Sequence, residues 1–259
     1  MADGFGIGVD IGSTATKAVV LGSDGDVVAT VLEPTGFSSV DAAERVRRAL
    51  RDRGFEVGEA GSARCVATGY GRIAVPYADD VVTEITCHGI GASRLFGGDG
   101  VVVDVGGQDT KVIRLRGGRV VKFAMNDKCA AGTGRFLEIM ADRLGVSQER
   151  LSALARMGSE TKISSMCTVF AESEVISLIG RGVAREDIAR GVIDSVVSRV
   201  SALVGQAGAG ADRVFLTGGL CENAFVAERL GEALGAAVVT CPMARYAGAL
   251  GAAVRALDS

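Results

Sequence analysis

Two segments of this 259-residue chain are alike, and their likeness constrains the fold more than any other feature. The first, VDIGSTATKAVVL, starts at Val9, and the second, VDVGGQDTKVIRL, starts at Val103. Two unrelated hairpins rarely share four identities at chemically distinctive positions, so the pattern predicts a duplicated architecture. At an offset of 94 residues, the matched pairs are Asp10 with Asp104, Gly12 with Gly106, Thr16 with Thr110, and Lys17 with Lys111.

Each copy of the repeat consists of an apolar strand, a glycine-containing turn and a second strand. The first copy continues through Asp24-Gly25 into VVATVLE, and the second crosses Gly117-Gly118 into RVVKFAM. Both patterns predict antiparallel hairpins, and helical periodicity follows each of them, which indicates an α/β fold. The predicted helices are Asp41–Arg53, Thr83–Phe96, Thr133–Leu144, Gln148–Arg156, Glu172–Ile179, Arg185–Val204, Glu222–Leu234 and Arg245–Leu257.

The glycine turns also carry a chemical prediction. A duplicated domain of this kind places its two turns across a cleft, where each turn offers backbone N–H groups to phosphate and each strand end offers an aspartate. Two carboxylates would repel a bare phosphate, so we expect Mg²⁺ between them. A third turn, Gly218-Gly219 in VFLTGGLCEN, follows another apolar strand. Any one of these turns could be purely structural, but the ordered set of three favours a nucleotide site.

These motifs resemble the acetate kinase, sugar kinase, Hsp70 and actin superfamily, whose halves have a ribonuclease H-like fold and enclose a nucleotide cleft. The resemblance implies that Gly218-Gly219 packs against adenosine. It also implies a first half over residues 1–98 and a second half over residues 99–243. A C-terminal helix within residues 244–259 is expected to pack back on the first half.

Six cysteines are present, without any C-x-x-C pair, so a disulfide framework is not expected. Cys129, in MNDKCAAGTGRFLE, precedes a glycine turn and a helix, and Cys167, in ISSMCTVFAESEVISLI, is expected to end a short strand before another helix. The positive end of a helix dipole stabilises thiolate and would also favour an anionic cluster. From spacing alone, two buried thiols remain an alternative for this pair.

Three of the other four cysteines favour structural roles, and Cys221 is expected to be incidental. Cys65 and Cys241 fall in or at the end of apolar strands, Cys87 lies in a helix beside His88, and Cys221 follows the third glycine turn. Two thiolates per chain cannot complete an iron–sulfur site that takes four ligands. A two-fold homodimer would supply the other two.

Six strings in the sequence carry a closer resemblance to one group within this superfamily. The strings GVDIGSTATK, VDVGGQDTKVI, MNDKCAAGTGRFLE, SSMCTVFAESEVISLI, TGGLCEN and GALGAA are similar to the activator components, or archerases, of 2-hydroxyacyl-CoA dehydratases, within the BadF/BadG/BcrA/BcrD ATPases. This resemblance implies an ATPase that binds ATP/ADP with Mg²⁺ and shares one [4Fe–4S] cluster per homodimer through Cys129 and Cys167. Ferredoxin or flavodoxin would supply an electron, which the dimer would pass at low potential to a dehydratase.

The expected site residues follow from the motifs. Asp10 and Asp104 are expected to order Mg²⁺ through water, and either Gln108 or Asp109 would position the attacking water, with Asp104 among the catalytic residues. Gly132-Thr133-Gly134 is expected to contact nucleotide and to relay its state to Cys129. The first phosphate turn comprises Asp10, Gly12, Ser13, Thr14 and Lys17, and the second comprises Asp104, Gly106, Gly107, Gln108 and Asp109.

Composition excludes some classes and leaves others open. The net charge of −3, with scattered Lys and Arg, argues against nucleic-acid binding. No uninterrupted apolar segment reaches the ~20 residues of a membrane span, so a cytoplasmic protein is expected. Alternatives are a nucleotide-binding subunit of a benzoyl-CoA reductase-type enzyme, the reductase of a related double-cubane iron–sulfur enzyme, a small-molecule kinase, or an ATP-dependent regulator. The sequence leaves the acyl-CoA and the electron donor open.

Overall fold

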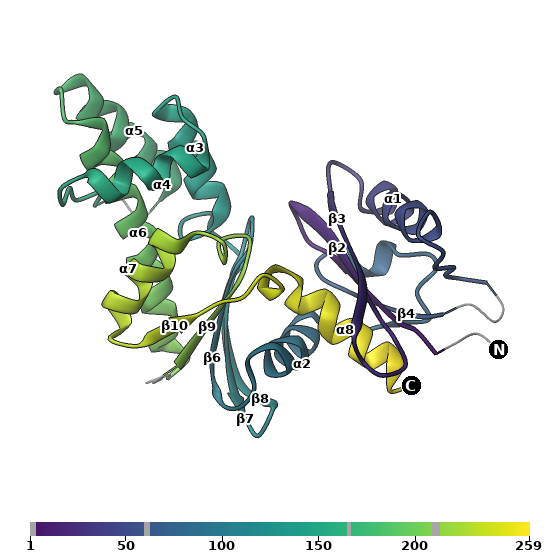
Figure 1. The fold of residues 1–259 in the computed structure, drawn as a ribbon. Helices are drawn as coiled ribbons and strands as arrows, with labels where there is room; N and C mark the ends of the chain where they lie inside the picture. Colours follow the sequence, from purple (N-terminus) through teal and green to yellow (C-terminus); the bar gives the residue numbers. More distant parts are fainter. Residues whose placement is uncertain (1–3, 60–62, 165–166, 209–212) are drawn as a thin grey trace. The chain divides into compact units, whose positions relative to one another are not determined.

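The chain forms two compact units, each built on a five-stranded sheet (Figure 1). The computed structural model describes residues 4–59, 63–164, 167–208 and 213–259. Unit 1 comprises Met1–Asp99, Leu115–Val121 and Pro242–Ser259, and unit 2 comprises Gly100–Arg114 and Lys122–Cys241. Within the described ranges, no helix is long and apolar enough to cross a bilayer.

Unit 1 contains a sheet with the strand order β3-β2-β1-β4-β5. The central strand β1 pairs antiparallel with β2 and parallel with β4. Its strands are β1 (Gly6–Ile11), β2 (Ala15–Leu21), β3 (Val27–Pro34), β4 (Arg64–Thr68) and β5 (Asp80–Val81), and its helices are α1 (Ser39–Arg51), α2 (Glu84–Phe96) and α8 (Ala247–Leu257), with short 3₁₀ turns at Arg72–Ala74 and Ala244–Tyr246.

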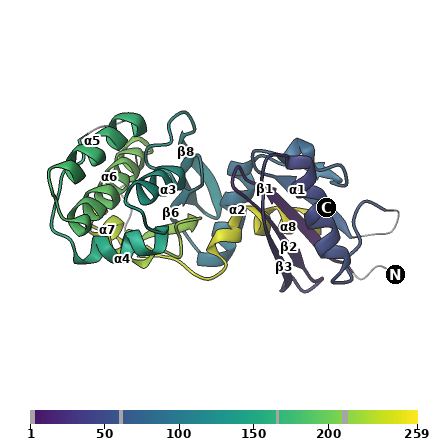
Figure 2. The ribbon, with the colours of Figure 1, turned by 90° about the horizontal axis from the view of Figure 1, so that it is seen from above.

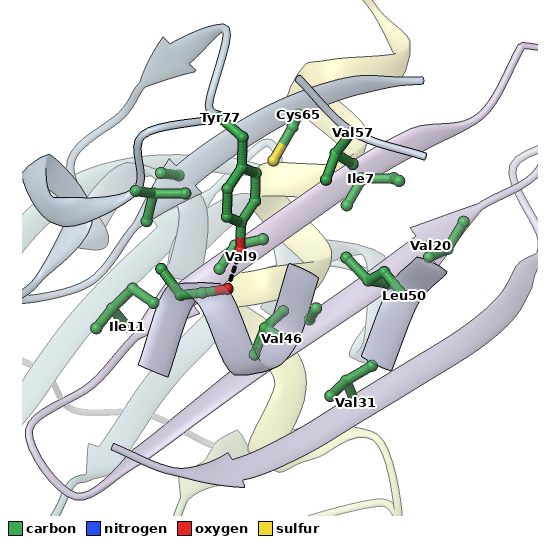
Figure 3. Packing of buried hydrophobic residues seen from close by; sticks show 14 residues of the cluster. Ile7, Val9, Ile11, Val20, Val31, Val46, Leu50, Val57, Cys65 and Tyr77 are labelled. Atoms are coloured by element: carbon green, nitrogen blue, oxygen red, sulfur yellow. Dashed lines mark hydrogen bonds between the residues drawn. The ribbon is translucent and has the colours of Figure 1, made fainter. Parts of the chain in front are cut away.

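Alternation along β1 separates the two faces of this sheet. Ile7, Val9 and Ile11 point into an apolar core with Val46 and Leu50 of α1, where all five side chains are buried (Figure 3). Because successive side chains in a strand point to opposite faces, the intervening residues face the other side. One face of β1 therefore packs through large aliphatic side chains.

The opposite face of β1 packs through glycine instead. A Cβ atom on Gly8 would lie only 2.0 Å from the carbonyl oxygen of Ala249 in α8. Helices α2 and α8 approach each other just as closely, since a Cβ on Gly91 would meet Ala247 O at 1.9 Å. Small residues thus let backbones touch, and this explains the Ala- and Gly-rich sequence of α8.

Unit 2 repeats the sheet order as β10-β9-β6-β7-β8, with β6, β7 and β8 in the places of β1, β2 and β3. Its helices gather together (Figures 1 and 2): α6 packs against α4 and α7, and α3 packs against α5. The duplicated architecture is therefore confirmed. The elements are β6 (Gly100–Val105), β7 (Thr110–Arg116), β8 (Arg119–Asn126), β9 (Arg213–Gly218), β10 (Ala237–Val239), α3 (Gly134–Arg143), α4 (Gln148–Met157), α5 (Thr168–Gly180), α6 (Arg185–Gln206) and α7 (Ala224–Leu234).

Several helix boundaries differ from the sequence prediction. Helix α5 starts at Thr168 rather than Glu172, because Cys167 has the extended backbone of an N-cap residue. The strand expected before Cys167 is absent from described residues Ser159–Ser164, and residues 165–166 lie outside the described ranges. Helix α7 starts at Ala224 because the Asn223 side chain accepts a hydrogen bond from the N–H of Val226.

Candidate functional site

The first glycine turn joins β1 to β2. The N–H of Gly12 donates to Ala15 O at 3.1 Å, and Thr35 Oγ1 donates to Gly12 O at 2.7 Å, so the turn is held from two sides. At the end of β1, Lys17 Nζ lies 3.4 Å from Asp10 Oδ2. The other turn residues, Ser13 and Thr14, are half-buried and exposed respectively.

The second glycine turn joins β6 to β7 and repeats this geometry. The N–H of Gly106 donates to Asp109 O at 2.9 Å, and Lys111 Nζ lies 3.4 Å from Asp104 Oδ2. Gly107 is half-buried and Gln108 is exposed. Each unit therefore presents an aspartate–lysine pair at the base of a glycine turn.

The two aspartates nevertheless differ in their partners. Asp104 Oδ1 accepts a hydrogen bond from Thr217 Oγ1 at 3.2 Å, and Lys111 also forms an ion pair with Asp109 at 2.7 Å. In unit 1, Asp10 Oδ1 is buried and has no hydrogen-bond partner among the residues that the structure describes. A buried carboxylate oxygen without a donor is costly, and an ordered water on a cation would supply one. Asp10 therefore fits Mg²⁺ coordination through water better than Asp104 does.

The third turn, Gly218-Gly219, lies directly against the side chain of Asp104. Gly218 has φ +81°, and a Cβ there would lie 2.5 Å from Asp104 Oδ1, while the N–H of Gly219 donates to Val105 O at 2.9 Å. Gly69 has the same place in unit 1: its φ is +90°, and a Cβ would lie 2.3 Å from Asp10 Oδ1. Both positions require glycine because the backbone is left-handed and the carboxylate is close.

Cys129 is exposed and lies in the loop between β8 and α3. The side-chain amide of Asn126 shapes this loop by donating to Cys129 O at 2.9 Å and to Ala131 O at 3.0 Å. The loop ends at Gly132, whose carbonyl accepts a hydrogen bond from Thr110 Oγ1 at 2.7 Å. Thr110 starts β7, directly after the second glycine turn, so this bond connects the cysteine loop to that turn.

Helix α3 starts on the second glycine turn. The N–H of Gly134 donates to Gly106 O at 2.9 Å, and the N–H of Arg135 donates to Gly107 O at 2.8 Å. The N–H and hydroxyl of Thr133 both donate to Ala130 O. The backbone donors of Thr133 and Gly134 thus bind protein carbonyls, and those of Gly134 and Arg135 join the turn to the helix.

Cys167 is also exposed, and its carbonyl accepts the first hydrogen bond of α5, from the N–H of Ala171 at 2.9 Å. Helix α5 packs against α3, and Arg143 of α3 forms an ion pair with Glu172 of α5. Both exposed cysteines therefore lie at or near the starts of two helices that contact each other. Among the described residues, no three His, Cys, Asp or Glu side chains form a group that could hold a metal ion.

The remaining cysteines are less accessible. Cys65 and Cys87 are buried, and burial raises the pKa of the Cys65 thiol to about 12 and that of Cys87 to about 11. Such thiols stay protonated at neutral pH and are poorly suited to ligate metal. Cys221 is buried, and Cys241, which follows β10, is half-buried. The packing role expected for Cys65 is confirmed.

Comparison with known proteins identifies the family. The model of the BadF/BadG/BcrA/BcrD ATPase family matches residues 7–256. The chain belongs to this family. The (R)-2-hydroxyglutaryl-CoA dehydratase activating ATPase of Acidaminococcus fermentans is 42% identical, over 97% of this chain and 96% of that protein. The activator of lactoyl-CoA dehydratase from Anaerotignum propionicum is also 42% identical, over 98% of both chains. A benzoyl-CoA reductase subunit from Thauera aromatica is 30% identical over 95% of this chain and 91% of that protein.

Solved structures of family members agree with this fold. Component A of the Acidaminococcus fermentans (R)-2-hydroxyglutaryl-CoA dehydratase superposes with a TM-score of 0.91 at 41% identity, covering 98% of each chain. The activator of 2-hydroxyisocaproyl-CoA dehydratase from Clostridium difficile, with bound ADPNP, has a TM-score of 0.89 at 37% identity, over 98% of this chain and 94% of that one. A ROK family glucokinase from Streptomyces griseus shares only the fold, at 15% identity and a TM-score of 0.62 over 99% of this chain and 100% of that one. The chain is thus an ATPase with the expected actin-like and sugar kinase-like fold.

Sequence reasoning missed residues that shape the site of this ATPase. Lys111 belongs to the repeat but was not expected to be a site residue, although it is buried between two aspartates. Gly69 was overlooked, although Thr68-Gly69 and Thr217-Gly218 are both Thr-Gly pairs after an apolar strand. The match of Lys111 with Lys17 was the signal for the first, and comparing the repeats beyond their first hairpins would have found Gly69.

Proposed function

We propose that this ATPase is an ATP-driven, low-potential electron donor that activates a 2-hydroxyacyl-CoA dehydratase. The names of the relatives support the activator role. The observation that carries the proposal is the continuous path in unit 2 from glycine turn to cysteine. Gly106 and Gly107 hold the start of α3, Thr110 holds Gly132, and Cys129 lies three residues before Gly132. A structural change in the second glycine turn can therefore move the cysteine loop through these hydrogen bonds.

The glycine turns are proposed to bind the ATP phosphates. Ser13 and Thr14 offer backbone and hydroxyl donors in unit 1, and Gly107 offers a backbone donor in unit 2, while the N–H groups of Gly12 and Gly106 close the two turns. Mg²⁺ would lie beside Asp10, whose buried Oδ1 lacks a donor, and the cation would neutralise phosphate charge during hydrolysis. Gly218-Gly219 is proposed to pack against adenosine, with Gly218 also holding Asp104 in place.

The attacking water is proposed to be oriented by Gln108. Its side chain is exposed in the second turn, whereas the Asp109 carboxylate forms an ion pair with Lys111 at 2.7 Å. A carboxylate that already accepts from a lysine is less available to accept a hydrogen bond from the attacking water. Gln108→Ala should therefore lower kcat for ATP hydrolysis, while Asp109→Asn should mainly affect stability.

Cys129 and Cys167 are proposed to ligate a [4Fe–4S] cluster at a two-fold axis, two from each chain of a homodimer. Both thiols are exposed, as ligands shared between chains require. Cys167 also starts a helix with an exposed apolar face, which suits contact with a second copy; its members are Val169, Phe170, Ile176 and Ile179. When bound, the cluster supplies one-electron transfer at low potential. The helix starts would stabilise the negative charge of the ligating thiolates.

The partner is proposed to be a dehydratase rather than a reductase. Identity is 42% to two dehydratase activators and 30% to the benzoyl-CoA reductase subunit. Ferredoxin or flavodoxin would supply the electron. The coupling step belongs to this chain: the second turn, changed by hydrolysis, moves α3 and the cysteine loop, and Arg143–Glu172 passes that movement to α5.

The test is metal analysis of anaerobically purified protein. We expect a brown dimer with about four irons and matching sulfide per dimer. Cys129→Ala or Cys167→Ala should lose the iron, while Cys241→Ala, a half-buried control, should keep it. Colourless wild-type protein, or a full iron complement in Cys167→Ala, would overturn the proposal. The dehydratase assignment is tested separately by ATP-dependent activation of a purified dehydratase and of a benzoyl-CoA-type reductase.

A further inference from the structure

Arg199, on α6, lies where the cysteine loop meets helix α3. Its guanidinium lies over the ring of Phe136 in α3, with Cζ 5.2 Å from the ring centroid, and Nη1 donates to Ser195 O at 3.1 Å. Nη1 also donates to Ser195 Oγ. These contacts orient the side chain toward α3 and restrict its rotamers.

The aliphatic part of Arg199 packs under Gly132. A Cβ on Gly132, whose φ is +86°, would lie 3.1 Å from Arg199 Cβ and 3.5 Å from its Cδ. The carbonyl of Gly132 is held from β7 by Thr110. Gly132 is thus fixed between Thr110 and Arg199, so a shift in the second glycine turn would change the contact with Arg199.

Arg199 carries its charge beside the loop of Cys129, because the aliphatic part of its side chain lies against Gly132, three residues after Cys129. Partial burial lowers the pKa of the guanidinium, and its interaction with Cys129 opposes that effect. An arginine stays protonated despite such burial. Arg199 therefore places a permanent positive charge beside the loop that carries one proposed ligand, and Cys129 itself is exposed.

We infer that Arg199 is a positioning residue for the cluster. The aliphatic part of its side chain supports Gly132, and its charge raises the reduction potential of the cluster. This inference rests on the proposed function. A positive charge near the cluster stabilises the reduced form, which carries one more negative charge than the oxidised form. Because the same side chain contacts Gly132, movement of the second turn would change the distance between the charge and the Cys129 sulfur. Arg199 would thus link nucleotide state to cluster potential.

The experiment compares four proteins, purified anaerobically as full-length dimers. Arg199→Met keeps an aliphatic side chain and removes the positive charge. Arg199→Lys keeps an aliphatic side chain and a positive charge, but not the guanidinium. Arg190→Met is the matched control, since Arg190 lies on the same helix and over an aromatic ring, that of Phe225, at 5.6 Å. Redox titration by EPR gives the reduction potential with Mg·ADP and with Mg·ATP, and an iron chelator gives the rate of iron loss.

We expect Arg199→Met to shift the potential downward, to shrink its response to ATP, and to lose iron about tenfold faster. Arg199→Lys should stay near wild type for potential, and Arg190→Met should match wild type in all three measurements. Equal potentials in wild type and Arg199→Met, or equal downward shifts in Arg199→Met and Arg190→Met, would overturn the inference. If Arg199→Met fails to fold, Arg199→Gln replaces it under the same criteria. A wild-type protein without iron would overturn both the inference and the proposed function.

Discussion

The two glycine turns share a motif, a place in the sheet and an aspartate–lysine separation of 3.4 Å, yet they differ in what surrounds the aspartate. Asp104 has protein donors on both oxygens, and its lysine is 1% exposed. Asp10 has one oxygen without a donor in the described part of the chain, and its lysine is 18% exposed. The two turns thus share a scaffold but differ in the groups that contact the aspartate. The turn of unit 1 is suited to a cation, and that of unit 2 is fixed to its own helix.

The largest difference is expected when the lysines are removed. Lys111→Met should destabilise the protein by about 3–5 kcal/mol, because it leaves buried Asp104 and half-buried Asp109 without their cation. Lys17→Met should cost about 1–3 kcal/mol, since only one buried carboxylate loses a donor and Lys17 is more solvated. Urea unfolding of both variants measures this. Equal losses would show that the two turns are energetically equivalent.

The rate of ATP hydrolysis should depend more on Asp10 than on Asp104, which reverses the order expected for stability. Asp10→Asn should lower kcat for ATP hydrolysis by about 10²–10³-fold and raise the Mg²⁺ concentration needed, because the amide supplies no negative charge to the cation. Asp104→Asn should lower kcat less and leave the Mg²⁺ requirement near wild type. Steady-state kinetics across a Mg²⁺ series tests the comparison. It fails if Asp104→Asn is the variant with the altered Mg²⁺ requirement.

The glycines behind the aspartates should respond alike. Gly69→Ala and Gly218→Ala each force a left-handed backbone on alanine and place a Cβ within 2.5 Å of a carboxylate oxygen, so each should cost about 1–3 kcal/mol. Thermal unfolding gives the loss, and Gly54→Ala is the control for strain alone, since no atom lies within 4 Å of its Cβ position. If only one of the two variants, Gly69→Ala or Gly218→Ala, keeps the wild-type Tm, the two glycines are not equivalent.

The smallest effect on stability is expected at the link between α3 and α5. Glu172→Gln should change the free energy of unfolding by less than about 1 kcal/mol, because Arg143 is half exposed. It should nevertheless reduce the effect of ATP on the rate of iron chelation. Glu138→Gln is the control, since Glu138 pairs with Arg135 within α3 alone. Equal ATP effects in both variants would show that this ion pair carries no movement to α5.

The repeat predicted the parts of the fold that depend on local pattern. Alternation and glycine turns were sufficient for β1–β2 and β6–β7, and periodicity located the helices. The start of α5 was wrong by four residues, because Cys167 is a weak cap by sequence and only its backbone conformation marks the boundary. Partners such as Thr217 for Asp104, 113 positions apart, arise from strand order and leave no local signal. Motif position singled out Cys129 and Cys167, and the structure shows that both are exposed rather than buried.

The most direct test of the central claim compares iron chelation from the wild-type dimer in Mg·ADP and in Mg·ATP, followed by EPR of the reduced cluster. Because the second glycine turn, α3 and the Cys129 loop are joined by hydrogen bonds, we predict different chelation rates in the two nucleotide states. Asp10→Asn, with weakened Mg²⁺ binding, should give the same rate with either nucleotide. Identical rates and spectra for the wild-type protein in both states would contradict the account of an ATP-driven electron donor.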